Sequence, residues 1–138
     1  MNRVIVYSDD PVVRSDVRQG VGVEPGDGLS AIEWVDCSTG AEVISDIDTG
    51  GVDLVILDGE AWPTGGMGLA RQLKDEIDDC PPTLVLIARR DDAWLAKWSL
   101  ADAVVPFPAD TAVLAGAVTA LLQGREQGLP VRRHVRSE

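Results

Sequence analysis

Asp53-Leu54-Val55-Ile56-Leu57-Asp58 is a run of four apolar residues between two aspartates, and it decides the fold. Gly50-Gly51 comes before it, and a loop with Pro63 and Gly65-Gly66 comes after it. Such a run is too short for an ordinary helix and predicts a strand buried on both faces of a parallel sheet. Its last residue, Asp58, then lies at the carboxyl end of the strand, where α/β sheets bind ligands.

Four other runs predict strands, at 3–7, 32–37, 83–88 and, more weakly, 101–105, because β-branched and apolar residues dominate them. Segments with apolar residues at helical spacing separate these runs. Five strand–helix units in 138 residues fit the small α/β fold of the flavodoxin-like type. We therefore expect a single domain with a doubly wound, open parallel sheet, (βα)5, in the strand order 2-1-3-4-5.

Capping and stop signals mark the ends of the predicted helices. Asp10 precedes Pro11 and is expected to cap the first helix, which Gly20 and Gly22 then end. The second helix is expected to begin at Ser38 or Thr39 and to stop at Gly50-Gly51, and the third to begin at about Met67 and to stop at Cys80-Pro81-Pro82. The fourth is expected to begin at Asp91 or Asp92. The last is expected to run from about Asp110 to Leu122, with Gly124 as its stop.

The composition, 45% hydrophobic and 25% charged, is ordinary for a globular protein. No apolar run approaches the roughly 18 residues that span a bilayer, so we expect no membrane partner and a cytoplasmic chain. In that reducing compartment Cys37 and Cys80, which fit no metal-binding spacing, are expected to be free thiols.

Charge is unevenly distributed along the chain. Residues 124–138 hold four Arg and two acidic residues, whereas residues 1–123 hold 8 basic and 21 acidic side chains, a net charge of −13. An acidic body argues against nucleic-acid binding by that body. The sequence thus predicts a domain over 1–123 and a basic, flexible tail over 124–138. Solvation is the favoured role of the tail, and docking on an acidic surface or a polyanion is the alternative.

The predicted strand order places the first and third strands side by side at the switch point of the sheet. Asp9 and Asp58 follow or end these two strands, so their carboxylates are expected to share one crevice. Such a pair can bind a hard cation, Mg²⁺ above all, and one carboxylate can act as a nucleophile toward a phosphoryl group. On spacing alone, a structural role as strand-end or helix-cap residues is favoured.

Residues 3–122 resemble the receiver domain of bacterial response regulators, CheY-like domains that here would stand alone. The segment 3–11 resembles the first strand and acidic cluster of that family, and 53–58 resembles its phosphoacceptor strand. Pro63 with Gly66-Met67-Gly68-Leu69 resembles its loop and third-helix entry, and Ala101-Asp102 with Phe107-Pro108 resembles its fifth strand and the end of that strand.

The resemblance implies roles for the acidic residues. Asp58 would take a phosphoryl group from a histidine kinase or phosphotransfer protein and form an acyl phosphate. Asp9, Asp58 and the main-chain carbonyl of Glu60 would bind Mg²⁺, and Asp10 is a further candidate ligand. The cation would neutralise charge on the phosphoryl group during transfer.

The chain departs from the family pattern where phosphate is sensed. The family's first acidic position falls on Ser8, its hydroxyl residue on Ile87 (or Ala88, one residue on), its lysine on Phe107 and its switch aromatic on Val104. Loss of each charge-assisted contact costs about 1.5–3 kcal/mol, so weak phosphotransfer and an atypical switch are implied. Arg89 and Arg90 are candidate substitutes, although ordinary surface positions are favoured for both.

Trp94 and Trp98 lie four residues apart and share one face of the predicted fourth helix. Core packing is the favoured interpretation, because aromatic side chains fill cores. If they are exposed, they would anchor an interface, since Trp is enriched at binding hot spots. In the family, the face formed by helix 4, strand 5 and helix 5 is the usual partner or homodimer surface.

The function implied is a receiver in a two-component phosphorelay that is not an enzyme. No DNA-binding domain follows Leu122, so the chain is expected to act on a downstream protein target. The alternative is a phosphorylation-independent pseudo-receiver that serves as a protein-interaction or dimerisation module. A metal-dependent phosphatase-type enzyme is the least favoured, because it needs a general base and the single histidine, His134, lies in the tail.

Overall fold

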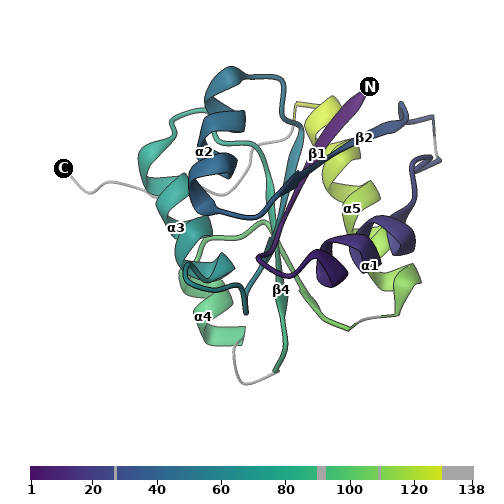
Figure 1. Ribbon diagram of the computed structural model, residues 1–138. Helices are drawn as coiled ribbons and strands as arrows, with labels where there is room; N and C mark the ends of the chain where they lie inside the picture. The colour runs from purple at the N-terminus through teal and green to yellow at the C-terminus, as the bar shows by residue number, and fades with distance from the viewer. Residues whose placement is uncertain (27, 90–92, 109, 129–138) are drawn as a thin grey trace.

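The computed structural model describes residues 1–26, 28–89, 93–108 and 110–128. Strands and helices alternate along the chain, and the five strands form one parallel sheet in the order β2-β1-β3-β4-β5 (Figure 1). The predicted doubly wound, single-domain α/β fold is therefore confirmed. The elements are β1 (Asn2–Tyr7), α1 (Pro11–Val21), β2 (Ile32–Cys37), α2 (Gly40–Thr49), β3 (Leu54–Asp58), α3 (Gly66–Glu76), β4 (Thr83–Ile87), α4 (Ala93–Trp98), β5 (Ala103–Pro106) and α5 (Thr111–Glu126).

Helices cover both faces of the sheet, with α1 and α5 on one face and α2, α3 and α4 on the other (Figure 1). Every residue of β3 and β4 is buried, as their continuous apolar runs predict. Along β3, Leu54 and Ile56 pack in the core under α1 and α5, whereas Val55 and Leu57 pack in the core under α2 and α3. The sheet thus has two apolar layers, and burial of each such side chain is worth about 1.5–3 kcal/mol.

The register of the central strands sets the position of the acidic residues. Tyr7 of β1 lies opposite Leu57 of β3, and Asp58 lies opposite Leu86 of β4. Ser8 and Asp9 follow β1 directly, so they reach the same edge of the sheet as Asp58. The crevice predicted at the switch point therefore lies where the strand order places it.

The predicted helix caps are confirmed at α1 and α2, and the residue at the expected start of α5 is also a cap. The side chain of Asp10 accepts a hydrogen bond from the amide of Val12, with Pro11 at the first helical position. Thr39, rather than Ser38, caps α2, and Asp110 caps α5. Each cap satisfies an amide that has no partner inside its helix.

Several predicted boundaries were wrong by a few residues. Helix α1 ends at Gly22, whose φ of 80° suits glycine, but Gly20 lies inside it. Helix α3 begins at Gly66 and ends at Glu76. Helix α5 continues through Gly124 to Glu126, where Arg125 pairs with Asp53, and this tertiary contact overrides the low helix propensity of glycine.

The fifth strand also starts later than predicted, at Ala103, and it includes Pro106. Asp102 precedes it because its carboxylate is bound to the ammonium of Lys74 and to the amide of Thr83. Proline is tolerated in β5 because this strand forms the edge of the sheet.

The favoured core-packing interpretation of the two α4 tryptophans was wrong. Trp94 is 69% exposed and Trp98 is 49% exposed. The guanidinium of Arg71 lies 5.4 Å from the ring centroid of Trp98 and also donates to the carbonyl oxygen of that residue. This stacking holds the Trp98 ring on the surface.

Other predictions fall partly outside the described residues. These include the expected α4 caps Asp91 and Asp92, the hypothesis on Arg90, the tail from residue 129 onward, and His134. Within the described residues, Cys37 and Cys80 are buried free thiols, as predicted. Across that same part of the chain, no helix has the length and apolar character to cross a membrane.

Candidate functional site

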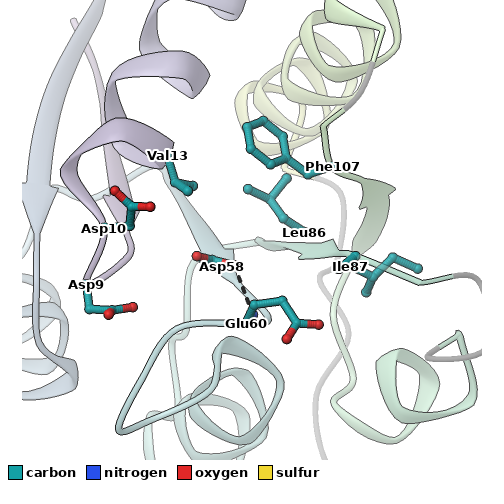
Figure 2. A pocket seen from close by; sticks show the side chains of 9 residues that line it. Asp9, Asp10, Val13, Asp58, Glu60, Leu86, Ile87 and Phe107 are labelled. Atoms are coloured by element: carbon teal, nitrogen blue, oxygen red, sulfur yellow. Dashed lines mark hydrogen bonds between the residues drawn. The ribbon is translucent and has the colours of Figure 1, made fainter.

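A cavity of about 290 Å³ opens at the carboxyl ends of the central strands. Figure 2 shows Asp58 between two unlike walls, with Asp9 and Asp10 on one side and Ile87 and Phe107 on the other. The lining consists of Asp9, Asp10, Val13, Asp58, Glu60, Leu86, Ile87, Ala88 and Phe107. The structure therefore brings the predicted acidic residues and two of the atypical positions into one site.

Asp58 ends β3 and is only 9% exposed. Its Oδ2 accepts a hydrogen bond from the hydroxyl of Ser8 at 2.7 Å. Its Oδ1 accepts one from the amide of Glu60 at 2.9 Å. Both oxygens are thus oriented by donors of this chain, which offsets the cost of burying a carboxylate.

Two glycines allow the backbone to pack closely around Asp58. A Cβ atom on Gly66, at the start of α3, would lie 2.5 Å from the carbonyl oxygen of Asp58. A Cβ atom on Gly59 would lie 2.5 Å from the carbonyl oxygen of Leu86. The end of β3 is therefore held between α3 and β4 at distances that only glycine permits.

The other two aspartates of the cavity are exposed and bound to backbone amides. Asp9 Oδ1 accepts from the amide of Trp62 at 2.9 Å, which ties the loop after β3 to the end of β1. Asp10 caps α1 with one of its oxygens. The structural roles favoured from spacing alone are therefore present, and each carboxylate also faces the cavity (Figure 2).

The donor atoms of the site suit a hard cation. Asp9 and Asp58 contribute carboxylate oxygens to the same cavity. Over the described residues, however, no group of three or more His, Cys, Asp or Glu residues is arranged to hold a metal ion. Because Mg²⁺ usually binds through one or two carboxylates together with water and phosphate oxygens, this pair fits a weakly held Mg²⁺.

The charge of this edge acts on Tyr7, which is buried beside it. The Tyr7 hydroxyl donates to the carbonyl oxygen of Thr64. Burial raises the pKa of Tyr7, and the negative charges of Asp9 and Asp58 raise the pKa of this phenol further. The neutral phenol is therefore favoured next to an anionic site.

The opposite wall of the cavity is apolar. Ile87 is 5% exposed and packs in the core under α2 and α3, and the half-buried Phe107 packs against the core under α1 and α5. Among the described residues that line the cavity, none is Lys or Arg, and Arg89 is exposed outside the lining. Ile87 and Phe107 can therefore exclude water but cannot donate a hydrogen bond to a phosphoryl oxygen.

Two predicted residues of interest lie away from the cavity. Val104 is exposed on β5, and Trp94 is exposed on α4. Val104 therefore lies on the edge strand of the sheet, and Trp94 lies on the helix that precedes this strand.

Sequence reasoning missed the contact between Ser8 and Asp58 and the lining roles of Val13 and Leu86. Ser8 was considered only as a missing acid, because its partner lies 50 residues away along the chain. The register of the strands carries the signal that could have found it, since Tyr7 pairs with Leu57 and the next residues must therefore be neighbours.

Comparison with known proteins gives consistent results, although no family model matches the chain. Uncharacterized response regulatory proteins of two Mycobacterium tuberculosis strains, CDC 1551 / Oshkosh and H37Rv, are 51% identical over 121 residues, which cover 88% of this chain and 91% of theirs. A response regulator receiver domain protein from Clostridium thermocellum has the same fold, with a TM-score of 0.75, 19% identity and coverage of 94% of this chain and 100% of its own. The response regulatory domain of protein mrkE from Klebsiella pneumoniae gives a TM-score of 0.72 at 19% identity, covering 91% and 98%.

The relatives from Mycobacterium match almost the whole chain, and the two solved structures share its fold. The chain therefore belongs to the response regulator family of two-component signalling, as a CheY-like receiver domain.

Proposed function

We propose that this receiver accepts a phosphoryl group on Asp58 and passes the signal on through protein contacts. The position of Asp58 supports this most directly, because its oriented carboxylate ends a buried central strand inside a cavity beside Asp9. A histidine kinase or a phosphotransfer protein would supply the phosphoryl group. The response regulatory unit would comprise 1–123, and 124–138 would form a basic extension whose first residues continue α5.

In the proposed transfer, an oxygen of Asp58 forms a bond to phosphorus as the bond between phosphorus and the donor breaks. The electron pair of the broken bond leaves with the donor. Asp9, Asp58 and the main-chain carbonyl of Glu60 would hold Mg²⁺, with Asp10 as a further candidate. The ion would neutralise charge on the phosphoryl group.

The readout of this proposed phosphorylation is atypical. Ile87 and Phe107 meet the cavity with hydrocarbon where the family pattern has a hydroxyl and a lysine. Val104 stands exposed in place of the switch aromatic. Weak transfer and a small conformational response are expected, because no described side chain of that wall gains a contact when phosphate arrives.

The test is covalent labelling of the full chain by acetyl phosphate with Mg²⁺, followed by intact mass. Wild type should gain one phosphoryl group and Asp58→Asn should gain none. Asp53→Asn is the matched control, since Asp53 precedes the same strand at its other end. An unlabelled wild-type chain removes the assignment of Asp58 as acceptor.

A second function, a protein-interaction module that ignores phosphorylation, is favoured by the exposure of Trp94 and Trp98. Both are exposed on α4, where Arg71 of α3 contacts Trp98, and Val104 is exposed on β5. Such a surface fits a downstream protein target or a homodimer, since exposed aromatic side chains anchor interfaces. Sedimentation of wild type and Trp94→Ala distinguishes a homodimer from contact with a different protein. A monomer in both cases excludes the homodimer.

A further inference from the structure

Ser8 follows β1 and is completely buried, and its hydroxyl makes two hydrogen bonds. Its Oγ accepts from the amide of Asp10 at 3.0 Å and donates to Asp58 Oδ2 at 2.7 Å. Because the backbone N–H of Asp10 can only donate, this hydrogen bond uses a lone pair of the Ser8 hydroxyl oxygen. The hydroxyl proton is therefore directed at the carboxylate.

This bond acts on the orientation of Asp58. With the Glu60 amide on Oδ1 and the Ser8 hydroxyl on Oδ2, each carboxylate oxygen has one donor of this chain. Two donors from two different strand ends define the plane of the carboxylate. The lone pairs that remain on these oxygens are then presented to the cavity in one direction.

The residue type at position 8 also sets the charge of the site. Four acidic residues already line the cavity, and among the described lining residues there is no Lys or Arg to balance them. A carboxylate at position 8 would lie against Asp58 as a like charge and would require a cation, whereas a hydroxyl supplies a donor. Ser8 can thus orient the acceptor before any ion binds.

We propose that Ser8 is the positioning residue of the acceptor, and that its hydroxyl holds Asp58 in the conformation from which the carboxylate attacks phosphorus. This rests on the proposed function of Asp58. It predicts that the donor O–H of Ser8, rather than the volume of its side chain, controls the reactivity of the site.

Labelling by acetyl phosphate at fixed Mg²⁺ measures the first consequence. Ser8→Ala should label about tenfold more slowly than wild type, a difference of about 1.4 kcal/mol in the barrier. Ser8→Thr keeps the hydroxyl and should stay within about threefold of wild type, or about 0.7 kcal/mol. Ser38→Ala is the matched control, because Ser38 donates to Glu42 and does not line the cavity, and it should leave the rate unchanged.

The conformation of Asp58 is measured separately, from the three-bond couplings that report its χ1 angle by NMR. Wild type should show one rotamer and Ser8→Ala an average of several, with Ser8→Thr restoring the single rotamer. Ser8→Cys, which keeps the volume but has only a weak donor, replaces Ser8→Ala if that variant melts below the assay temperature.

The two measurements distinguish the possible failures. If wild type takes no label, the proposed function of Asp58 fails, and the couplings alone decide the role of Ser8. A single Asp58 rotamer that persists in Ser8→Ala overturns the positioning role, and so does a labelling rate equal to wild type. Slow labelling shared by Ser8→Ala and Ser8→Thr overturns it as well, since only a packing defect is common to both.

Discussion

At the amino-terminal edge of the sheet the carboxylates of Asp102 and Asp53 pair with cations, whereas the two aspartates that meet at the cavity of the carboxyl-terminal edge accept from uncharged donors. Asp102 binds the ammonium of Lys74 at 2.7 Å, and Asp53 pairs with Arg125 at 3.3 Å. At the opposite edge, Asp58 and Asp9 accept from Ser8 and from backbone amides. Over the described residues, neither of these two aspartates forms an ion pair.

The two edges of the sheet therefore differ in role: ion pairs stabilise the amino-terminal edge, and the candidate site lies at the carboxyl-terminal edge. A balanced pair such as Lys74 and Asp102 leaves no unmet charge and therefore offers nothing to a ligand. An unbalanced cluster costs stability and attracts a cation or a group that brings one. The cluster of Asp9 and Asp58 thus lies at the carboxyl-terminal edge, where α/β sheets bind ligands.

The largest effect is expected from removal of Lys74, the cation of the ion pair with Asp102. Lys74→Met should lower the free energy of unfolding by about 3–5 kcal/mol, because the buried carboxylate of Asp102 loses the ammonium that balances its charge. Urea unfolding of the variant measures this loss. Lys97→Met is the control, since Lys97 is exposed on α4, and its change should stay below about 0.5 kcal/mol. Equal midpoints for the two variants would show that the pair adds nothing.

A smaller effect is expected where the carboxyl-terminal edge depends on close packing rather than on charge. Gly66→Ala should destabilise the chain by about 1–3 kcal/mol, because its Cβ would lie 2.5 Å from the Asp58 carbonyl oxygen. Gly68→Ala, two residues on in the same helix, meets nothing within 4 Å and should stabilise it by up to about 1 kcal/mol. Opposite signs in thermal unfolding confirm the contact, and equal signs contradict it.

The fold could be predicted because β3 and β4 are continuous apolar runs and because sheet geometry restricts their order. The position of the site followed from that order, since Asp58 and Asp9 end or follow neighbouring strands. The contact of Ser8 could not be predicted, because a serine hydroxyl has many possible partners and its actual one is distant in the sequence.

The outward orientation of Trp94 and Trp98 likewise could not be predicted from the sequence. A spacing of four residues shows that two side chains share a helix face, but it does not show which way that face points. Gly124 was misread for a related reason, since a local stop signal cannot register the contact between Arg125 and Asp53.

The smallest expected effect is a pH dependence of stability that arises from Cys37, the last residue of β2 at the carboxyl-terminal edge. Burial raises the pKa of Cys37 from its ordinary value of 9.0 to about 12, helped by its hydrogen bond to Asp46 at 3.3 Å. A raised pKa means that folding favours the neutral thiol, so this contribution is complete below pH 9 and declines as pH rises toward 12. Between pH 8 and pH 10 the free energy of unfolding should therefore fall by about 1 kcal/mol more in wild type than in Cys37→Ser.

The Cys37→Ser comparison isolates the thiol, because serine does not titrate in this range and every other group changes equally in both proteins. The amino-terminal edge supplies the contrast, since Cys80→Ser removes a buried thiol that donates to a carbonyl oxygen instead of a carboxylate. Parallel pH curves for wild type and Cys37→Ser would mean that the thiol ionises as easily in the folded chain as in the unfolded one. The carboxylates of α2 would then have no effect on the Cys37 thiol, and only the cavity around Asp58 would show the effect of clustered negative charge.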